Sequence, residues 1–102
     1  MGGYVYLICD AATEYYKIGV TRGSIENRIK KLQTGNGNEL HVVSYFPSKR
    51  PFKMEKMLHT RFADRRVLNE WFELSPEEVF SFQDICTEVE ETIKALADNP
   101  FF

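Results

Sequence analysis

The pattern of hydrophobic and polar positions predicts strands early in the chain, with helices between and after them. Residues 4–9 form a run of aromatic and β-branched side chains, and residues 15–20 form a second run. Only a short polar segment separates the two runs, so we expect them to pair as an antiparallel hairpin. Residues 40–46 predict a third strand, which Pro47 is expected to close.

In the segment after the hairpin, apolar residues recur at the spacing of an amphipathic helix. Ile25, Ile29 and Leu32 fall on one face of a helix that would begin after Ser24 and end near Gly35. Serine is a favoured N-cap residue and glycine a common helix stop, so both boundaries are well marked.

A second helix is predicted from Pro51 to about residue 63. Its apolar face is formed by residues at helical spacing, namely Met54, Leu58 and Phe62. Arg65 and Arg66 are expected in the loop that follows, and residues 70–74 are expected to be extended against the sheet.

The last part of the chain begins with a helix-start motif. Ser75 can cap the helix, Pro76 suits the first helical position, and Glu78 completes a capping box. Apolar residues then recur every three or four positions, which predicts one amphipathic helix or a pair: Val79, Phe82, Cys86, Val89, Ile93 and Leu96.

This order of elements is typical of an α+β domain with a small, mostly antiparallel sheet flanked by helices. The length of 102 residues suits one domain. We expect residues 1–76 to form its main part and residues 77–102 to form an acidic amphipathic helix packed on it.

The charge distribution changes how the net charge of −2 is interpreted. Residues 1–69 hold 12 of the 13 Lys and Arg residues but 6 of the 15 acids, a net charge of +6. Residues 70–102 hold only Lys94 against 9 acids, a net charge of −8. The asymmetry favours a basic working surface, and the acidic segment is interpreted either as a functional element or as a solvated helix.

Composition also narrows the class of protein. The chain has no apolar run near the roughly 20 residues that span a bilayer, so no membrane association is expected. The N-terminus does not resemble a secretion signal, and Cys9 and Cys86 match no metal-ligand spacing. We therefore expect Cys9 and Cys86 to be reduced thiols in a cytoplasmic protein.

Five polar side chains in this plan each have an ordinary structural explanation when considered alone. Tyr6 suits a core aromatic with its hydroxyl at the rim, while Lys17 and Arg28 suit exposed positions on a strand and a helix. Glu55 and His59 lie four apart on a helix, which suits a surface pair and does not by itself make a zinc site. A Ser/His/Asp triad, a Cys nucleophile and a glycine-rich phosphate loop have no support in the spacing.

Taken in order, however, five motifs of the chain resemble a known family. They are VYLI at residues 5–8, YKIG at residues 16–19, LQTGN at residues 32–36, EKMLH at residues 55–59 and EWF at residues 70–72. The set is similar to the GIY-YIG nuclease superfamily, in particular to its branch of phage-type and "meiotically up-regulated" DNA-binding domains. The resemblance covers roughly residues 3–76.

The resemblance implies cleavage of a DNA phosphodiester with one divalent metal ion, Mg²⁺ or Mn²⁺. It implies that Tyr6 acts as general base, that Arg28 contacts the scissile phosphate, and that Glu55 binds the metal. Lys17 stands where the best-known members have tyrosine, so it either supplies positive charge to Tyr6 or grips phosphate. His59 would orient the leaving group or hold a phosphate.

Further basic residues are expected to contact the DNA backbone, which gives affinity without sequence information. They are Arg22, Lys30, Lys31, Lys53, Arg61, Arg65 and Arg66, with Lys49 and Arg50 nearby in the sequence. The acidic C-terminal helix is expected to lie away from the DNA.

Three hypotheses therefore stay open at this stage. The first is a metal-dependent DNA endonuclease, and the second is a DNA-binding module of the same fold without efficient cleavage. The third is an interaction or inhibitor protein, which would use the acidic helix and the apolar tip at Phe101 and Phe102 to form a homodimer or bind a protein partner.

Overall fold

The computed structural model describes residues 2–97 and confirms the α+β fold class. One antiparallel sheet of five strands has the order β3-β1-β2-β5-β4. The elements, in chain order, are β1 (Gly3–Asp10), β2 (Tyr16–Thr21), α1 (Ile25–Thr34), β3 (Leu40–Ser48), α2 (Pro51–Arg61), a 3₁₀ turn (Ala63–Arg65), β4 (Arg66–Leu68), β5 (Trp71–Phe72), α3 (Pro76–Phe80) and α4 (Phe82–Leu96).

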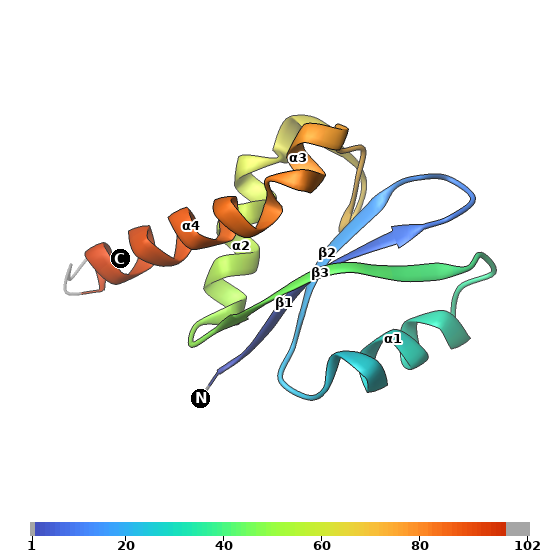
Figure 1. Ribbon diagram of the computed structural model, residues 1–102, viewed down its shortest axis with the longest axis horizontal. Helices are drawn as coiled ribbons and strands as arrows, with labels where there is room; N and C mark the ends of the chain where they lie inside the picture. The colour runs from blue at the N-terminus through green and yellow to red at the C-terminus, as the bar shows by residue number, and fades with distance from the viewer. Residues whose placement is uncertain (1, 98–102) are drawn as a thin grey trace.

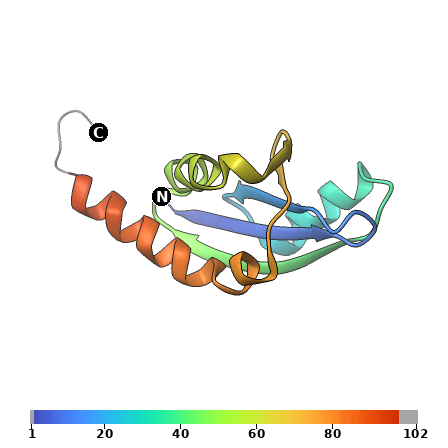
Figure 2. The same cartoon turned by 90° about the horizontal axis from the view of Figure 1, so that it is seen from above.

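The sheet separates α1 from α2 and α4 (Figure 1). On one face, Val5 and Leu7 of β1 join the main core with residues of α2 and α4. On the other face, Tyr6 and Ile8 form a smaller core, against which α1 and Trp71 pack. Alternating side chains of one strand thus supply both cores, as the two-residue period of a strand requires. Figure 2 shows α4 extending past the end of the sheet.

The predicted hairpin is present, and its register positions the later site. Tyr6 of β1 lies opposite Gly19 of β2, and Ile8 lies opposite Lys17. Residues paired in this way project from the same face of a sheet, so Tyr6 and Lys17 share the face that α1 covers.

The boundaries of α1 agree with the prediction from its capping residues. The Ser24 hydroxyl accepts a hydrogen bond from the Asn27 amide, and the Gly35 amide donates to Gln33 O. The structure also confirms the capping box between Ser75 and Glu78, which starts α3.

Three predicted boundaries were wrong. β3 continues through Pro47 to Ser48, because β3 is an edge strand and an edge position tolerates the missing amide donor. The second helix ends at Arg61 rather than near residue 63, and a 3₁₀ turn follows it. Arg66 begins the short strand β4 rather than lying in a loop.

Candidate functional site

The candidate site lies where the sheet is incomplete beside β2. Within the described residues, only Tyr16 and Lys17 of β2 pair with β5, so most of the outer side of β2 has no strand beside it. At the next residue of β2, the Ile18 amide still donates to Glu70 O (3.1 Å). The carbonyl of Ile18, however, accepts a hydrogen bond from the His59 side chain of α2. Side chains of α1 and α2, which pack on opposite faces, can therefore meet at the open edge of β2.

Tyr6 reaches this edge by lying across Gly19. A Cβ built on Gly19 would fall 2.6 Å from the ring carbon Cζ of Tyr6 and would also collide with its hydroxyl. Glycine is therefore the residue that leaves room for the tyrosine ring at this position. The ring is buried, with 1% exposure, and its hydroxyl oxygen accepts a hydrogen bond from Nε of Arg28 (3.2 Å).

This contact identifies the cationic side chain that hydrogen-bonds to the Tyr6 hydroxyl in the structure. The sequence predicts Lys17 as one source of positive charge for the tyrosine, but Arg28 makes the hydrogen bond. A guanidinium that donates to a phenolic oxygen stabilises negative charge on that oxygen. The same contact, with Glu70 and Glu55 nearby, raises the pKa of Arg28, so its charge is permanent.

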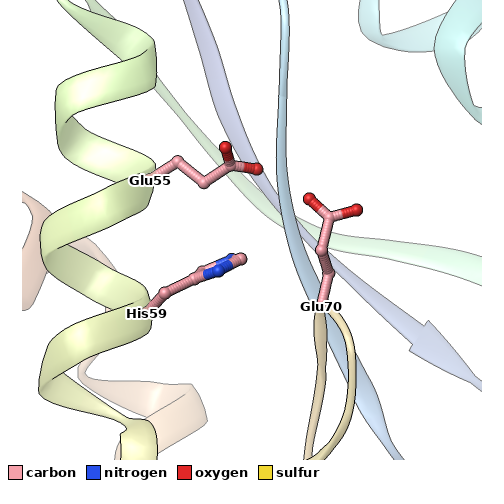
Figure 3. A group of neighbouring side chains, drawn as sticks. All are labelled: Glu55, His59 and Glu70. Atoms are coloured by element: carbon pink, nitrogen blue, oxygen red, sulfur yellow. The ribbon is translucent and has the colours of Figure 1, made fainter.

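Three potential metal ligands face one another across the open edge (Figure 3). Glu55 and His59 come from successive turns of α2, and Glu70 precedes β5. One ligand atom from each lies within 4.8 Å of the other two, and all three side chains are half-buried. The sequence predicts Glu55 as a ligand, but Glu70 is not among its predicted site residues.

The orientation of His59 follows from a backbone contact. Its Nε2 lies 2.8 Å from Ile18 O. Because a carbonyl only accepts hydrogen bonds, Nε2 carries a proton, and Nδ1 of the neutral ring is the nitrogen with a lone pair. His59 also packs edge-on against Phe72, with ring centroids 5.1 Å apart, so the ring is held from two sides.

The two carboxylates of the cluster have opposite pKa shifts. Burial, the hydrogen bond with Glu70 and the negative charge of Glu70 raise the pKa of Glu55 to about 7. Burial acts in the same direction on Glu70, but its hydrogen bonds with Glu55 and Lys17 outweigh burial and lower the pKa of that carboxyl. Opposite shifts of this kind are typical of two carboxyl groups close enough to repel each other when both are charged.

Lys17 belongs to this site through Glu70. Its Nζ lies 2.9 Å from Glu70 Oε2, and 5.5 Å from the ring centroid of Trp71. The Lys17 side chain is 13% exposed and the Glu70 side chain 37%, so the lysine is largely buried rather than solvated, while its partner remains in contact with solvent.

The predicted DNA-contacting residues are distributed over several surfaces. Arg61 pairs with Glu88 of α4 (3.1 Å) and Arg65 with Glu78 of α3 (3.4 Å), so acids of the C-terminal segment neutralise both. The others lie elsewhere: Arg22 over the Phe52 ring, Arg66 over the Phe72 ring, Lys30 and Lys31 exposed on α1, and Lys53 half-buried on α2. Phe101 and Phe102, predicted as a contact for a partner, lie outside the described residues.

A second polar cluster was also missed, at the far end of the hairpin. Asp10 is 5% exposed and accepts from the Ala12 amide (2.9 Å), the Thr13 amide (3.2 Å) and Asn38 Nδ2 (3.0 Å). Gln33 donates to Asn38 O (2.8 Å) and accepts from the Leu40 amide (2.8 Å). The LQTGN motif is therefore explained by the loop after α1, which this network holds.

Comparison with known proteins identifies one family. A family model described as the T5orf172 domain matches residues 3–95, which includes most of the acidic C-terminal segment. This is a phage-associated domain related to endonuclease-type modules. No curated protein and no solved structure matches the chain. Among residues 2–97, the helices are all too short or too polar to cross a bilayer.

Proposed function

The chain belongs to the T5orf172 domain family, and on that premise we propose that it is a metal-dependent DNA endonuclease of the GIY-YIG type. One observation carries the proposal. Side chains from both faces of the sheet converge at the open edge of β2, where Arg28 contacts Tyr6 and interacts electrostatically with Glu55 and Glu70 of the metal-ligand cluster.

The cluster fits a divalent cation. Glu55 and Glu70 supply oxygen ligands of the kind that Mg²⁺ and Mn²⁺ prefer, and the raised pKa of Glu55, about 7, supports the binding of a cation between the two carboxylates. His59 adds a nitrogen ligand, and its hydrogen bond to a backbone carbonyl is the support common for metal-binding histidines. A bound ion would polarise the phosphate and stabilise charge on the leaving oxygen.

Tyr6 and Arg28 suit the attack of water on a phosphodiester. As a phenolate, Tyr6 would take a proton from the water whose oxygen forms the new bond to phosphorus, while the bond from phosphorus to one sugar oxygen breaks. The hydrogen bond from Arg28 Nε stabilises that phenolate. The Nη groups of Arg28 are the donors we assign to the non-bridging phosphate oxygens, where charge builds up.

Nicking of supercoiled plasmid in Mg²⁺ or Mn²⁺ tests the proposal. Glu55→Ala and Tyr6→Phe should each reduce the nicking rate at least about 100-fold, because each removes a group that acts in the transition state. Glu88→Ala is the matched control. Glu88 is an exposed acid of α4 that pairs with Arg61 of α2, so its replacement should leave nicking unchanged. Nicking that survives both Tyr6→Phe and Glu55→Ala would show the site assignment to be wrong.

A DNA-binding module without efficient cleavage is the second candidate, and the Lys17–Glu70 ion pair favours it. This internal cation lies 2.9 Å from a carboxylate that the metal would need. Under this alternative, a salt-sensitive gel shift should occur without metal-dependent cleavage. A protein that nicks plasmid only with metal would exclude it.

A further inference from the structure

A small pocket of about 230 Å³ opens beside the candidate site. It lies between α1, the loop after α1 and β5, and the residues that line it include Lys17, Lys31, Leu32, Asn36, Leu40 and Trp71. Lys17 lines this Trp71 pocket and also pairs with Glu70 of the cluster at the open edge, so the pocket and the cluster adjoin. The pocket is smaller than the roughly 300–1,000 Å³ of sites for drug-sized ligands, so we expect it to take a single ring system rather than a larger group.

The wall of the pocket is held in place by the second polar cluster. Asn36 donates to Asn38 O (2.9 Å), and Asn38 in turn donates to Asp10 (3.0 Å). Gln33 fixes the same loop through Asn38 O and the Leu40 amide. A loop secured by this many hydrogen bonds is preorganised for a ligand rather than free to close the pocket.

The groups that face the pocket suit a nucleic acid strand. Lys31 is exposed on α1 and provides an ammonium group for a phosphate. Trp71 is half-buried and provides an indole against which a base can pack. None of the described residues that line the pocket is acidic. The charge of the pocket is therefore complementary to that of a phosphodiester.

We propose that the Trp71 pocket holds the nucleotide next to the scissile phosphate, with its base against Trp71 and its phosphate paired with Lys31. The inference rests on the proposed function, because it takes the DNA strand to pass through the open edge of β2. It assigns a substrate-binding role to Trp71, to which the resemblance assigned none, and a defined position to Lys31.

The sequence makes the test direct, because Trp71 is the only tryptophan. A labelled single-stranded oligonucleotide of about 12 nucleotides, within the usual range of single-strand sites, is titrated in EDTA so that no cleavage occurs. Tryptophan emission reports the pocket, and anisotropy of the label independently reports binding. Lys31→Ala is compared with Lys94→Ala, which removes the same charge from an exposed residue outside the pocket, on the helix α4 that is expected to lie away from the DNA.

The proposal expects saturable quenching of Trp71 at the concentrations where anisotropy rises. It also expects Lys31→Ala to weaken binding about fivefold and Lys94→Ala less than about twofold, because Lys31 holds the bound phosphate and Lys94 lies away from the pocket. Binding with unchanged Trp71 emission, or equal affinities of the two variants, would overturn the nucleotide-binding role of the Trp71 pocket and leave the proposed function intact. Absence of binding by anisotropy at low salt would overturn the proposed pocket, whereas nicking of double-stranded plasmid tests the proposed function separately.

Discussion

Two acidic groups on the same small domain show opposite electrostatic environments. Asp10, at one end of the hairpin, accepts hydrogen bonds from two amides and from Asn38, and these contacts lower its pKa despite burial. Glu55, at the open edge of β2, faces a second carboxylate, and burial together with that neighbour raises its pKa to about 7. The first carboxylate is satisfied by the protein itself, which marks it as structural. The second keeps a raised pKa although Lys17 and Arg28 lie nearby, so it is the carboxylate that we propose binds a cation.

The largest expected effect comes from a substitution that disturbs the geometry of the open edge but changes no charged residue. Gly19→Ala would place a Cβ against the Tyr6 ring and displace it from Arg28, so nicking should fall about 100-fold, as expected for a misplaced catalytic group. Gly23→Ala is the control, because the nearest atom to its added Cβ is Thr21 Oγ1 at 3.9 Å. Equal nicking rates of the two variants would mean that the Tyr6 position is not required.

The next effect concerns the satisfied carboxylate. Asp10→Ala removes the acceptor of three hydrogen bonds at a buried position, so the free energy of unfolding should fall by about 3 kcal/mol. Urea denaturation at pH 7 measures this loss, and Asp64→Ala, at an exposed residue of the 3₁₀ turn, should change little. A loss of the same size in both variants would remove the distinction between the buried and the exposed acid.

The smallest effect is a difference in pH dependence. Because the folded-state pKa of Glu55 lies near 7 and its ordinary value is 4.5, the folded state holds a proton that the unfolded state releases. Stability should therefore decline as pH rises from about 4.5 to 7. Asp10 has the opposite sign: its contribution is present above its ordinary pKa of 3.8 and is lost as pH falls through the lower folded-state pKa.

Glu55→Gln separates the two contributions. Its free energy of unfolding, measured in EDTA between pH 5 and pH 8 (roughly the range where the Glu55 proton is lost), should exceed that of the unchanged protein increasingly as pH rises. Parallel curves would contradict the raised pKa of Glu55.

Much of the fold followed from local rules. Ser24 and Gly35 marked the ends of α1, and the capping box at Ser75 marked the start of α3. β4 could not be found in the same way, because a three-residue strand has no measurable period and all its side chains are exposed. The end of α2 was also displaced, since the 3₁₀ turn continues a helical pattern without continuing the helix.

The candidate site was less accessible to sequence reasoning, because its contacts join distant segments. Tyr6, Arg28 and Glu55 could be named from their motifs. The choice of Arg28 rather than Lys17 as the partner of Tyr6 depends on the space above Gly19, which only the paired strands define. Glu70 was not predicted as a metal ligand, because its approach to Lys17 and to the cluster depends on the pairing of β5 with β2. The EWF motif was the signal that could have identified it.

Titration calorimetry with Mn²⁺ tests the central claim, that the open edge of β2 is a metal site. The unchanged protein should bind one ion at pH 8, where Glu55 is deprotonated. Glu55→Gln should lose this binding, and Glu88→Gln should retain it, because Glu88 lies on α4 and pairs with Arg61. An absence of heat with the unchanged protein, or equal binding by Glu55→Gln, would contradict the account.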